Sequence, residues 1–171
     1  MGTVHVYTGN GGGKTTSTLG LALRSTGWKH KTIMIQFLKG RKGIGEWKAA
    51  KRLAPYFEIY SFGSPKFVNP YNPSRKDFEY AKQAIEFARK VLKEKKPDLL
   101  ILDEANIAMD FKLVKVEDVL KLIKEAPKKT RIVLTGRHAP KKIREIADFV
   151  TEIRDIKRPS HLEGPLKGIE Y

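Results

Sequence analysis

Close to its start the chain carries the segment Thr8-Gly9-Asn10-Gly11-Gly12-Gly13-Lys14-Thr15-Thr16. The alternating run Val4-His5-Val6-Tyr7 before it is typical of a short buried strand, and the apolar spacing from Leu19 to Leu23 after it is helical. A glycine-rich turn that joins a strand to a helix and ends in Gly-Lys-Thr is the context of a phosphate-binding loop, or P-loop. The sequence therefore predicts that this chain binds a nucleoside triphosphate.

Each residue type in this segment suits phosphate binding. Glycines let consecutive backbone amides converge on a phosphate, and the N-terminus of the following helix adds the positive end of its dipole. Lys14 supplies a mobile cation for phosphate oxygens, and the Thr15 hydroxyl is placed to ligate Mg²⁺. The predicted triphosphate-binding residues are Thr8, Gly9, Asn10, Gly11, Gly12, Gly13, Lys14, Thr15 and Thr16.

One position of the segment departs from the usual pattern. The consensus begins with a glycine at the position that Thr8 occupies here. We therefore expect a loop that is one residue tighter, with Gly9 as the first residue of the turn. A glycine-rich turn that binds nothing is the alternative, and both flanking segments argue against it.

A second predicted half of the site follows the apolar run Leu99-Leu100-Ile101-Leu102, which is typical of a strand buried on both faces of a parallel sheet. The run ends in Asp103-Glu104. Carboxylates at the tip of such a strand, in a chain with a phosphate-binding loop, complete a magnesium–nucleotide site because the metal compensates their charge. The alternative is a solvated turn after the strand.

The remaining periodicity predicts an α/β domain with a mostly parallel central sheet and helices on both faces. We expect residues 1–171 to form a single P-loop nucleotide-binding domain of the RecA-like kind, with an irregular tail from residue 157 ordered against the sheet. Ser74 and Asp77 predict a capping box at the start of the longest helix. Further strands are expected at 32–37, 57–62, 132–134 and 149–153, and further helices at 47–53, 116–123 and 143–147.

Three loops after strands are candidates for the active edge, where ligands of open α/β sheets gather. The basic, glycine-rich loop 39–46 either faces the phosphate site or is an ordinary connection with solvated lysines. The aromatics of loop 63–73 either contact a ligand or anchor the loop to the core, and we favour anchoring. Arg137, at the end of the strand 132–134, is a candidate phosphate clamp, with a surface salt bridge as its alternative.

The net charge of the chain limits which binding partners are expected. The chain has 34 lysines and arginines against 19 acidic residues, a formal charge of +15. This charge fits either a nucleic-acid-binding face or a Lys/Glu-rich solvated surface around an anionic substrate. Because basic residues are interspersed with acidic ones along helices and no basic motif is interleaved with aromatics, we favour the second interpretation and expect no nucleic-acid partner.

Cysteine is absent, which excludes disulfides, a thiol nucleophile and thiolate metal ligands. No apolar run approaches the length of a membrane-spanning helix, and the chain enters its first predicted strand without a signal-like segment. We therefore expect a soluble, cytoplasmic protein with no membrane contact.

Taken together, the ordered motifs resemble the P-loop class of ATP:corrinoid adenosyltransferases over essentially the whole chain. The loop alone is shared by many unrelated NTPases, whereas the ordered set, including the unusual Thr8, is far more specific. The motifs are residues 8–16, Gln36-Phe37-Leu38-Lys39-Gly40, Leu102-Asp103-Glu104, Thr135-Gly136-Arg137, Val150-Thr151-Glu152-Ile153 and Lys167-Gly168-Ile169-Glu170-Tyr171.

The resemblance implies an enzyme that transfers the 5′-deoxyadenosyl group of ATP to the cobalt(I) of a corrinoid and releases triphosphate. The substrate itself brings the nucleophile, which agrees with the absence of an evident serine, cysteine or histidine nucleophile. The protein has to orient ATP and neutralise the leaving triphosphate. Members of the family bind ATP in the reverse of the usual direction, with the terminal phosphate deep in the loop. The resemblance also implies a homodimer and a flavoprotein reductase that supplies cobalt(I).

Transferred onto this sequence, the resemblance assigns roles to individual residues. Lys14, Glu104 and Arg137 would be the catalytic residues, with Arg137 also contacting ATP. Thr15 and Glu104 would hold Mg²⁺, supported by Asp103. Phe67 falls on the first of two loop positions whose aromatic side chains displace the lower axial ligand of the corrinoid. The second position, usually Trp, falls on Asn69, with Tyr71 as a nearby substitute.

Two other classes of function remain open from the sequence. A P-loop ATPase or nucleotide kinase of the RecA or thymidine-kinase type would use Asp103 and Glu104 as magnesium ligand and base. A basic, nucleotide-dependent nucleic-acid binder is the non-enzymatic alternative. The two enzymes differ in their products, since only the adenosyltransferase forms triphosphate together with a cobalt–carbon bond. The nucleic-acid binder is distinguished by a salt-dependent affinity for DNA or RNA.

Overall fold

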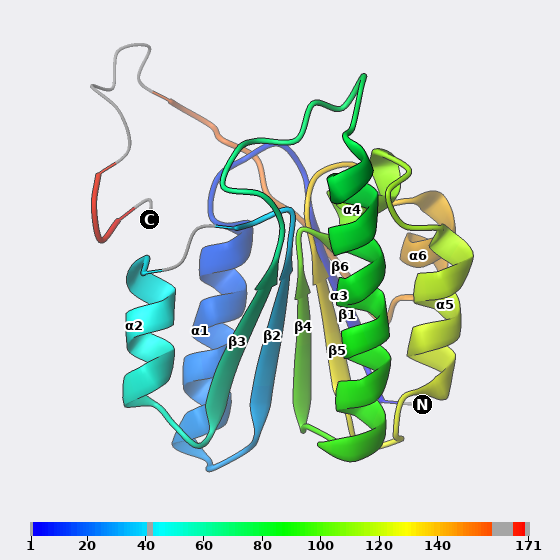
Figure 1. The fold of residues 1–171 in the computed structure, drawn as a ribbon. Helices are drawn as coiled ribbons and strands as arrows, with labels where there is room; N and C mark the ends of the chain where they lie inside the picture. The colour runs from blue at the N-terminus through cyan, green and yellow to red at the C-terminus, as the bar shows by residue number, and fades with distance from the viewer. Residues whose placement is uncertain (1, 41–42, 159–165, 170–171) are drawn as a thin grey trace.

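The computed structural model describes residues 2–40, 43–158 and 166–169. Within this part of the chain, six strands form one sheet in the order β3-β2-β4-β5-β1-β6, and every pairing is parallel (Figure 1). The strands are β1 (Val4–Thr8), β2 (Thr32–Phe37), β3 (Phe57–Phe62), β4 (Leu99–Asp103), β5 (Arg131–Thr135) and β6 (Phe149–Glu152). The predicted α/β fold is confirmed, and all carboxyl ends of the strands meet at one edge.

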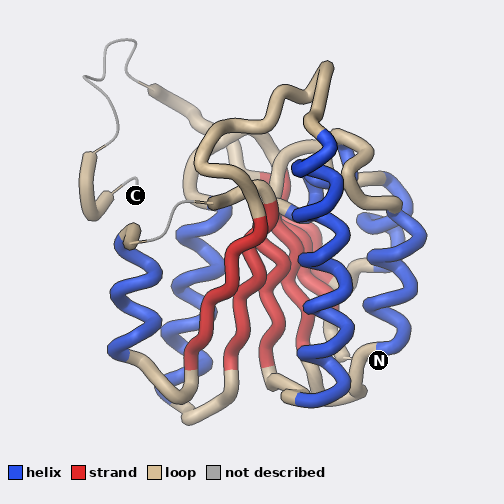
Figure 2. Tube along the Cα trace, viewed as in Figure 1, coloured by secondary structure: helices blue, strands red, loops and turns tan. Residues whose placement is uncertain are grey.

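Helices cover both faces of this sheet, as predicted (Figure 1). One face is covered by α1 (Lys14–Gly27) and α2 (Gly45–Arg52). The other face is covered by α3 (Arg75–Glu94), α4 (Ala105–Asp110), α5 (Val116–Glu125) and α6 (Lys141–Ile146). In the tube view, the loops that leave the strands at the upper edge gather above the sheet (Figure 2).

Because helices cover both faces of the sheet, the hydrophobic core has two parts, one on each face. Every residue of β2 and β4 is buried, which explains why the run 99–102 is continuously apolar. Successive side chains of a strand point to opposite faces, so Met34 and Ile101 pack with α1 and α2 while Ile33 and Ile35 pack with α3 and α5. The order of strands places β5 between β1 and β4, so the strand before the glycine-rich loop and the strand that carries Asp103 are not neighbours.

The longest helix begins at the predicted cap. The Ser74 side chain accepts a hydrogen bond from the Asp77 backbone amide, and the Asp77 carboxylate accepts one from the Ser74 amide at 2.8 Å, which completes the capping box. Ala81, Ala84 and Ala88 are buried along its inner face. Phe78 shares the three- and four-residue spacing of this face but lies in the first turn of the helix and is 44% exposed.

Two features differ from the sequence-based expectations. The short helix α4 was not predicted, and it begins directly after Glu104, whose φ of 62° turns the chain sharply out of β4. In the tail, residues 166–169 are exposed, so this part does not pack on the sheet as expected. The rest of the predicted tail packing, at 159–165 and 170–171, lies outside the described residues.

Candidate active site

The glycine-rich loop is shaped by the segment that follows β6. Gly9 has a φ of 98°, and a Cβ atom at this position would lie 2.3 Å from the Ile153 carbonyl oxygen, so only glycine fits. The Gly11 amide donates to the Ile153 carbonyl at 2.9 Å, and the Gly12 amide donates to Asp155 Oδ1 at 2.9 Å. The chain therefore bends at Gly9, directly after β1, where the sequence predicts the first residue of the turn.

Thr8, the unusual first residue of the loop, binds to the protein itself. Its hydroxyl accepts a hydrogen bond from the Ala139 amide at 3.1 Å, and its carbonyl accepts one from Ile153 at 2.8 Å. The threonine thus ties the end of β1 to the loop after β5 on one side and to β6 on the other. A glycine at position 8 would lack the first of these contacts.

A cavity of about 620 Å³ opens at the carboxyl edge of the sheet over the rest of the loop. It brings together most of the sequence-predicted residues, namely residues 10–16, Glu104, Arg137 and Phe67. Leu38, Lys39, Val68, Ile107, Phe111, Arg158 and Ile169 complete its lining. Thr8, Gly9, Asp103 and Asn69 do not line it. The cavity therefore unites a phosphate-binding loop, a carboxylate and an aromatic side chain from three separate loops.

Lys14 is folded back into the loop. Its ammonium donates to the carbonyl oxygens of Gly9 at 2.9 Å and Gly11 at 2.6 Å, and the residue is only 8% exposed. Burial lowers the pKa of this ammonium and the Arg137 guanidinium lowers it further, while Glu104 acts in the opposite direction. An anion that enters the cavity would offer Lys14 a charged partner in place of two neutral carbonyls.

Asp103 is the buried centre of a hydrogen-bond network below the loop. Its Oδ1 accepts hydrogen bonds from the hydroxyls of Thr15 at 2.9 Å and Thr135 at 2.7 Å. Its Oδ2 accepts from the Lys39 ammonium at 2.6 Å and, at 3.5 Å, from the Gln36 amide. Asp103 is completely buried, so these donors replace the water that a carboxylate needs. The alternative of a solvated turn at this position is wrong.

Glu104 reaches the cavity from the sharp turn between β4 and α4. Its backbone amide donates to the Thr135 hydroxyl at 2.9 Å, which couples this turn to Asp103 through one shared side chain. Burial raises the pKa of the Glu104 carboxyl, and the adjacent Asp103 carboxylate raises it further, while the cations around the cavity only partly compensate. Two adjacent carboxylates of this kind favour an added positive charge.

The loop after β2 faces both cavities through Lys39, so at this residue it is not an ordinary connection with a solvated lysine. A Cβ atom on Gly40 would lie 2.4 Å from the Gly63 carbonyl oxygen, so glycine lets the loops after β2 and β3 pack directly on each other. Burial alone would lower the pKa of Lys39, but the Asp103 and Glu104 carboxylates outweigh burial and raise it. Residues 41–42 of this loop lie outside the described chain.

The aromatic side chains of loop 63–73 do not anchor it, and our interpretation was wrong. Phe67 is 92% exposed and Tyr71 is 95% exposed, whereas Val68 between them packs against the core. Phe67 lines the cavity beside Val68. Asn69 is exposed, and its side-chain oxygen accepts a hydrogen bond from the Tyr71 amide at 3.0 Å, which shapes the turn.

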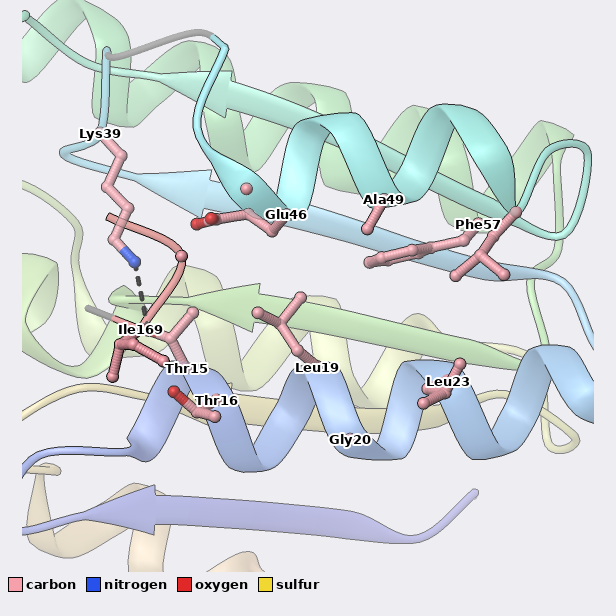
Figure 3. Close-up of a pocket in the computed structure, with 13 residues that line it drawn as sticks. Thr15, Thr16, Leu19, Gly20, Leu23, Lys39, Glu46, Ala49, Phe57 and Ile169 are labelled. Atoms are coloured by element: carbon pink, nitrogen blue, oxygen red, sulfur yellow. Dashed lines mark hydrogen bonds between the residues drawn. The ribbon is translucent and has the colours of Figure 1, made fainter. Parts of the chain in front are cut away.

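A second cavity of about 530 Å³ adjoins the first between α1 and α2 (Figure 3). Leu19 and Leu23 from α1 face Ala49 from α2 and Phe57 from β3 across it. The two cavities share Thr15, Thr16, Lys39 and Ile169. The phosphate-binding loop therefore opens on one side to an apolar cleft and on the other to the cavity that contains Glu104, Arg137 and Phe67.

The sheet order, the glycine-rich loop after β1 and the carboxylates at the end of β4 define the fold class of a RecA-like P-loop domain. In the described part of the chain, no helix is both long and apolar enough to cross a bilayer.

Comparisons with known proteins identify the family. The sequence model of the family described as ATP:corrinoid adenosyltransferase BtuR/CobO/CobP matches residues 1–171. A corrinoid adenosyltransferase of Sinorhizobium sp is 32% identical over 160 residues, which cover 92% of this chain and 74% of that protein. Corrinoid adenosyltransferases of Escherichia coli (strain K12) and Pseudomonas aeruginosa are 30% and 33% identical, over 91% and 99% of this chain and 78% and 84% of their own lengths. The chain belongs to the ATP:corrinoid adenosyltransferase family.

Three candidate site residues lie in motifs quoted above, but the sequence assigned no individual role to any of them. Gln36, Thr135 and Lys39 all contact Asp103. A signal for Gln36 was available, because a polar residue inside the otherwise apolar stretch 33–37 of a central strand requires a buried partner. Thr135 and Lys39 each follow or end a strand at the carboxyl edge, which is where ligand-binding residues of parallel sheets lie.

Proposed function

We propose that this protein transfers the 5′-deoxyadenosyl group of ATP to the cobalt(I) centre of a corrinoid and releases triphosphate. One observation carries this proposal most strongly: the phosphate-binding loop, Glu104, Arg137 and Phe67 line one cavity. The described residues that line it include no serine, cysteine or histidine. A reaction in which the substrate brings the nucleophile agrees with such a lining. The family relationship does not favour the ATPase or kinase alternative.

The protein's part in this reaction is to bind ATP and to neutralise the charge on the leaving triphosphate. The cobalt(I) electron pair attacks the ribose 5′ carbon, a cobalt–carbon bond forms, and the bond from this carbon to the triphosphate oxygen breaks. Loop residues 9–16 would bind the triphosphate, and Lys14 would neutralise charge on it as it leaves. Arg137, exposed on the cavity wall, would add a second cation. Phe67 and Asn69 would lie on the corrinoid side, with Tyr71 close by in the same loop.

The oxygen groups below the loop fit Mg²⁺. The Thr15 hydroxyl and the carboxylates of Asp103 and Glu104 are hard donors, which this ion prefers. The Lys39 ammonium contacts two of these three groups, so the site already accommodates a cation. Thr15 and Glu104 would hold the metal with Asp103 supporting them, and the bound ion would neutralise charge on the triphosphate.

The proposal is tested by mixing the purified protein, magnesium, ATP and chemically reduced cobalamin without oxygen. We expect the cobalt(I) absorbance to disappear while an equimolar amount of triphosphate forms. Conversion of ATP to ADP and phosphate with cobalt untouched would overturn the proposal in favour of an ATPase. Cobinamide serves as a parallel substrate that lacks the lower ligand.

We further propose, from the resemblance alone, a cytoplasmic homodimer that receives cobalt(I) from a flavoprotein reductase, with residues 1–171 acting as one nucleotide-binding domain. Light scattering after size-exclusion chromatography tests the dimer, and a monomeric mass would contradict it. Adenosylation of cob(II)alamin driven by a reduced flavoprotein tests the electron donor.

A further inference from the structure

The Lys39 ammonium lies between two of the oxygen groups that would serve magnesium. It donates to Thr15 Oγ1 at 3.1 Å (Figure 3) and to Asp103 Oδ2 at 2.6 Å. The Thr15 hydroxyl in turn donates to Asp103. We propose that Lys39 is a built-in cation, which occupies the divalent-cation position while nucleotide is absent and leaves it when metal and triphosphate bind. This inference rests on the proposed function only in its use of the metal site.

Asp103 requires such a cation. It is completely buried, and its other donors, Thr15, Thr135 and Gln36, are neutral. Among the residues that the structure describes, Lys39 is the only one in an ion pair with Asp103. A buried carboxylate without a compensating charge is costly, so some positive charge has to stay near it in every state of the site.

Lys14, the other lysine of the site, does not fill this role. Its ammonium is engaged by the carbonyl oxygens of Gly9 and Gly11. The two lysines therefore have different partners in the structure. Lys14 is retained inside the loop that receives the phosphates, and Lys39 neutralises the carboxylate beneath it.

Lys39 is also able to leave. Its side chain is 28% exposed while that of Asp103 is fully buried, and it lines both cavities. Figure 3 shows the side chain extending from the end of β2 toward Thr15 at the mouth of the cleft. The backbone beside it is fixed by the close approach of Gly40 to Gly63. Exchange thus requires rotation of one long side chain, after which the ammonium can reach phosphate oxygens.

A divalent ion and this ammonium exclude each other at Asp103. The nucleotide-free protein should therefore bind divalent ions weakly, and removal of the lysine charge should strengthen their binding. Mn²⁺ is the probe, because its free concentration is measured directly by electron paramagnetic resonance. Lys39→Gln removes the charge and keeps a hydrogen-bond donor, and Lys39→Met removes both. Lys48→Gln, at an exposed position of α2, is the matched control for the loss of one charge.

We expect Mn²⁺ to bind Lys39→Gln about tenfold more tightly than the parent protein, in the absence of nucleotide and corrinoid, since one fewer like charge lies within a few ångströms of the ion. Lys48→Gln should match the parent. Equal Mn²⁺ affinity of the parent and Lys39→Gln would overturn the proposal. Because no corrinoid is present, this result is independent of whether adenosyl transfer occurs.

A second measurement uses the parent protein alone and so does not depend on how the variants fold. Nitrogen-15 labelling of lysine side chains gives a signal for the Lys39 ammonium, assigned by its loss in Lys39→Gln or, if that variant does not fold, in Lys39→Arg. The proposal predicts that this signal moves when magnesium and ATP are added together. An unchanged signal under saturating magnesium and ATP would show that the lysine stays on Asp103 and would refute the exchange.

Discussion

Two lysine–carboxylate pairs on the same sheet differ in what surrounds the carboxylate. At the carboxyl edge, Lys39 pairs with the completely buried Asp103 beside two cavities. In the second pair, the Glu58 carboxylate of β3 accepts hydrogen bonds from Lys95 and from the Tyr60 hydroxyl, and its side chain is 28% exposed. Glu58 and Lys95 line neither cavity.

The difference in burial between the two carboxylates indicates that the two ion pairs have different roles. A partly solvated pair contributes little stability, because water already stabilises both charges. A buried pair is hardly better than apolar packing for stability, yet removal of one partner is costly. Such a pair persists beside a cavity when a ligand can take over one of its contacts. We therefore assign the Glu58 pair to the framework and the Asp103 pair to the exchange of cations.

The largest effect is expected for Lys14, the site lysine that pairs with neither carboxylate. Lys14→Ala should lower turnover of ATP and cob(I)alamin about 1,000-fold, because the leaving triphosphate loses a cation aimed at its charge. Lys95→Ala is the control, and its turnover should equal that of the parent. Near-normal turnover of Lys14→Ala would contradict the assignment of the loop.

The two pairs should also differ in stability. Lys39→Met should lower the free energy of unfolding at neutral pH by about 3 kcal/mol, because it leaves Asp103 buried without a cation. Lys95→Met should cost less than about 1 kcal/mol, since Glu58 keeps its contact with water. Urea denaturation measures both. The double variant Lys39→Met/Asp103→Asn should recover most of the loss, and equal losses for the two lysines would refute the distinction.

Features that depend on nearby residues could be predicted from the sequence, and contacts between distant segments could not. The loop and the Ser74–Asp77 capping box were predicted because each depends on neighbours within a few residues. The contact between Lys39 and Asp103 spans 64 positions and depends on the register that sets Gln36 beside Asp103 in adjacent strands. No periodicity encodes such a register. The hydrogen bond from the Ala139 amide to the Thr8 hydroxyl spans 131 positions and could not be predicted for the same reason.

The missed helix and the misjudged aromatics have different physical causes. Helix α4 has only six residues and follows a left-handed turn at Glu104, so neither its length nor its start gives a helical pattern. From the composition of loop 63–73 alone, anchoring was favoured for its aromatic side chains, because large apolar side chains are usually buried. Val68 packs against the core instead. Which of two adjacent side chains points inward depends on the path of the backbone, and the composition of the loop does not reveal this path.

The contrast extends to two phenylalanines. Phe67 lines the cavity, whereas the ring centroid of Phe87 on α3 lies 4.5 Å from that of Tyr60, whose hydroxyl donates to Glu58 of the framework pair. Phe67→Ala should slow the reaction with cobalamin about tenfold more than the reaction with cobinamide, a loss of about 1.4 kcal/mol confined to the substrate with a lower ligand. Steady-state kinetics with both corrinoids measure this ratio.

Phe87→Ala is the matched control. It should lower stability, because it removes a ring that packs on both Tyr60 and Phe62, and it should leave the ratio of the two rates unchanged. Equal slowing of both substrates by Phe67→Ala would remove Phe67 from the corrinoid side of the site.

The smallest effect is expected at Glu58 and depends on pH. Burial alone would raise the pKa of Glu58, but the hydrogen bonds from Lys95 and Tyr60 outweigh it and lower the pKa below its ordinary value of 4.5. A lowered pKa in the folded state adds stability above the ordinary value, and this stability is lost as pH falls through the lowered pKa. Glu58→Gln should therefore cost less than about 1 kcal/mol at pH 7, and the cost should vanish in acid.

Urea denaturation of the parent and Glu58→Gln between pH 7 and pH 3 measures this dependence, and adenosyl transfer at pH 7 gives the second readout. Because Glu58 lines neither cavity, turnover of the variant should equal that of the parent. A cost that persists in acid would mean that Glu58 acts through packing and not through charge. A loss of turnover would mean that the framework pair and the exchange pair are coupled through β2, which pairs with the Glu58 strand β3 on one side and with the Asp103 strand β4 on the other.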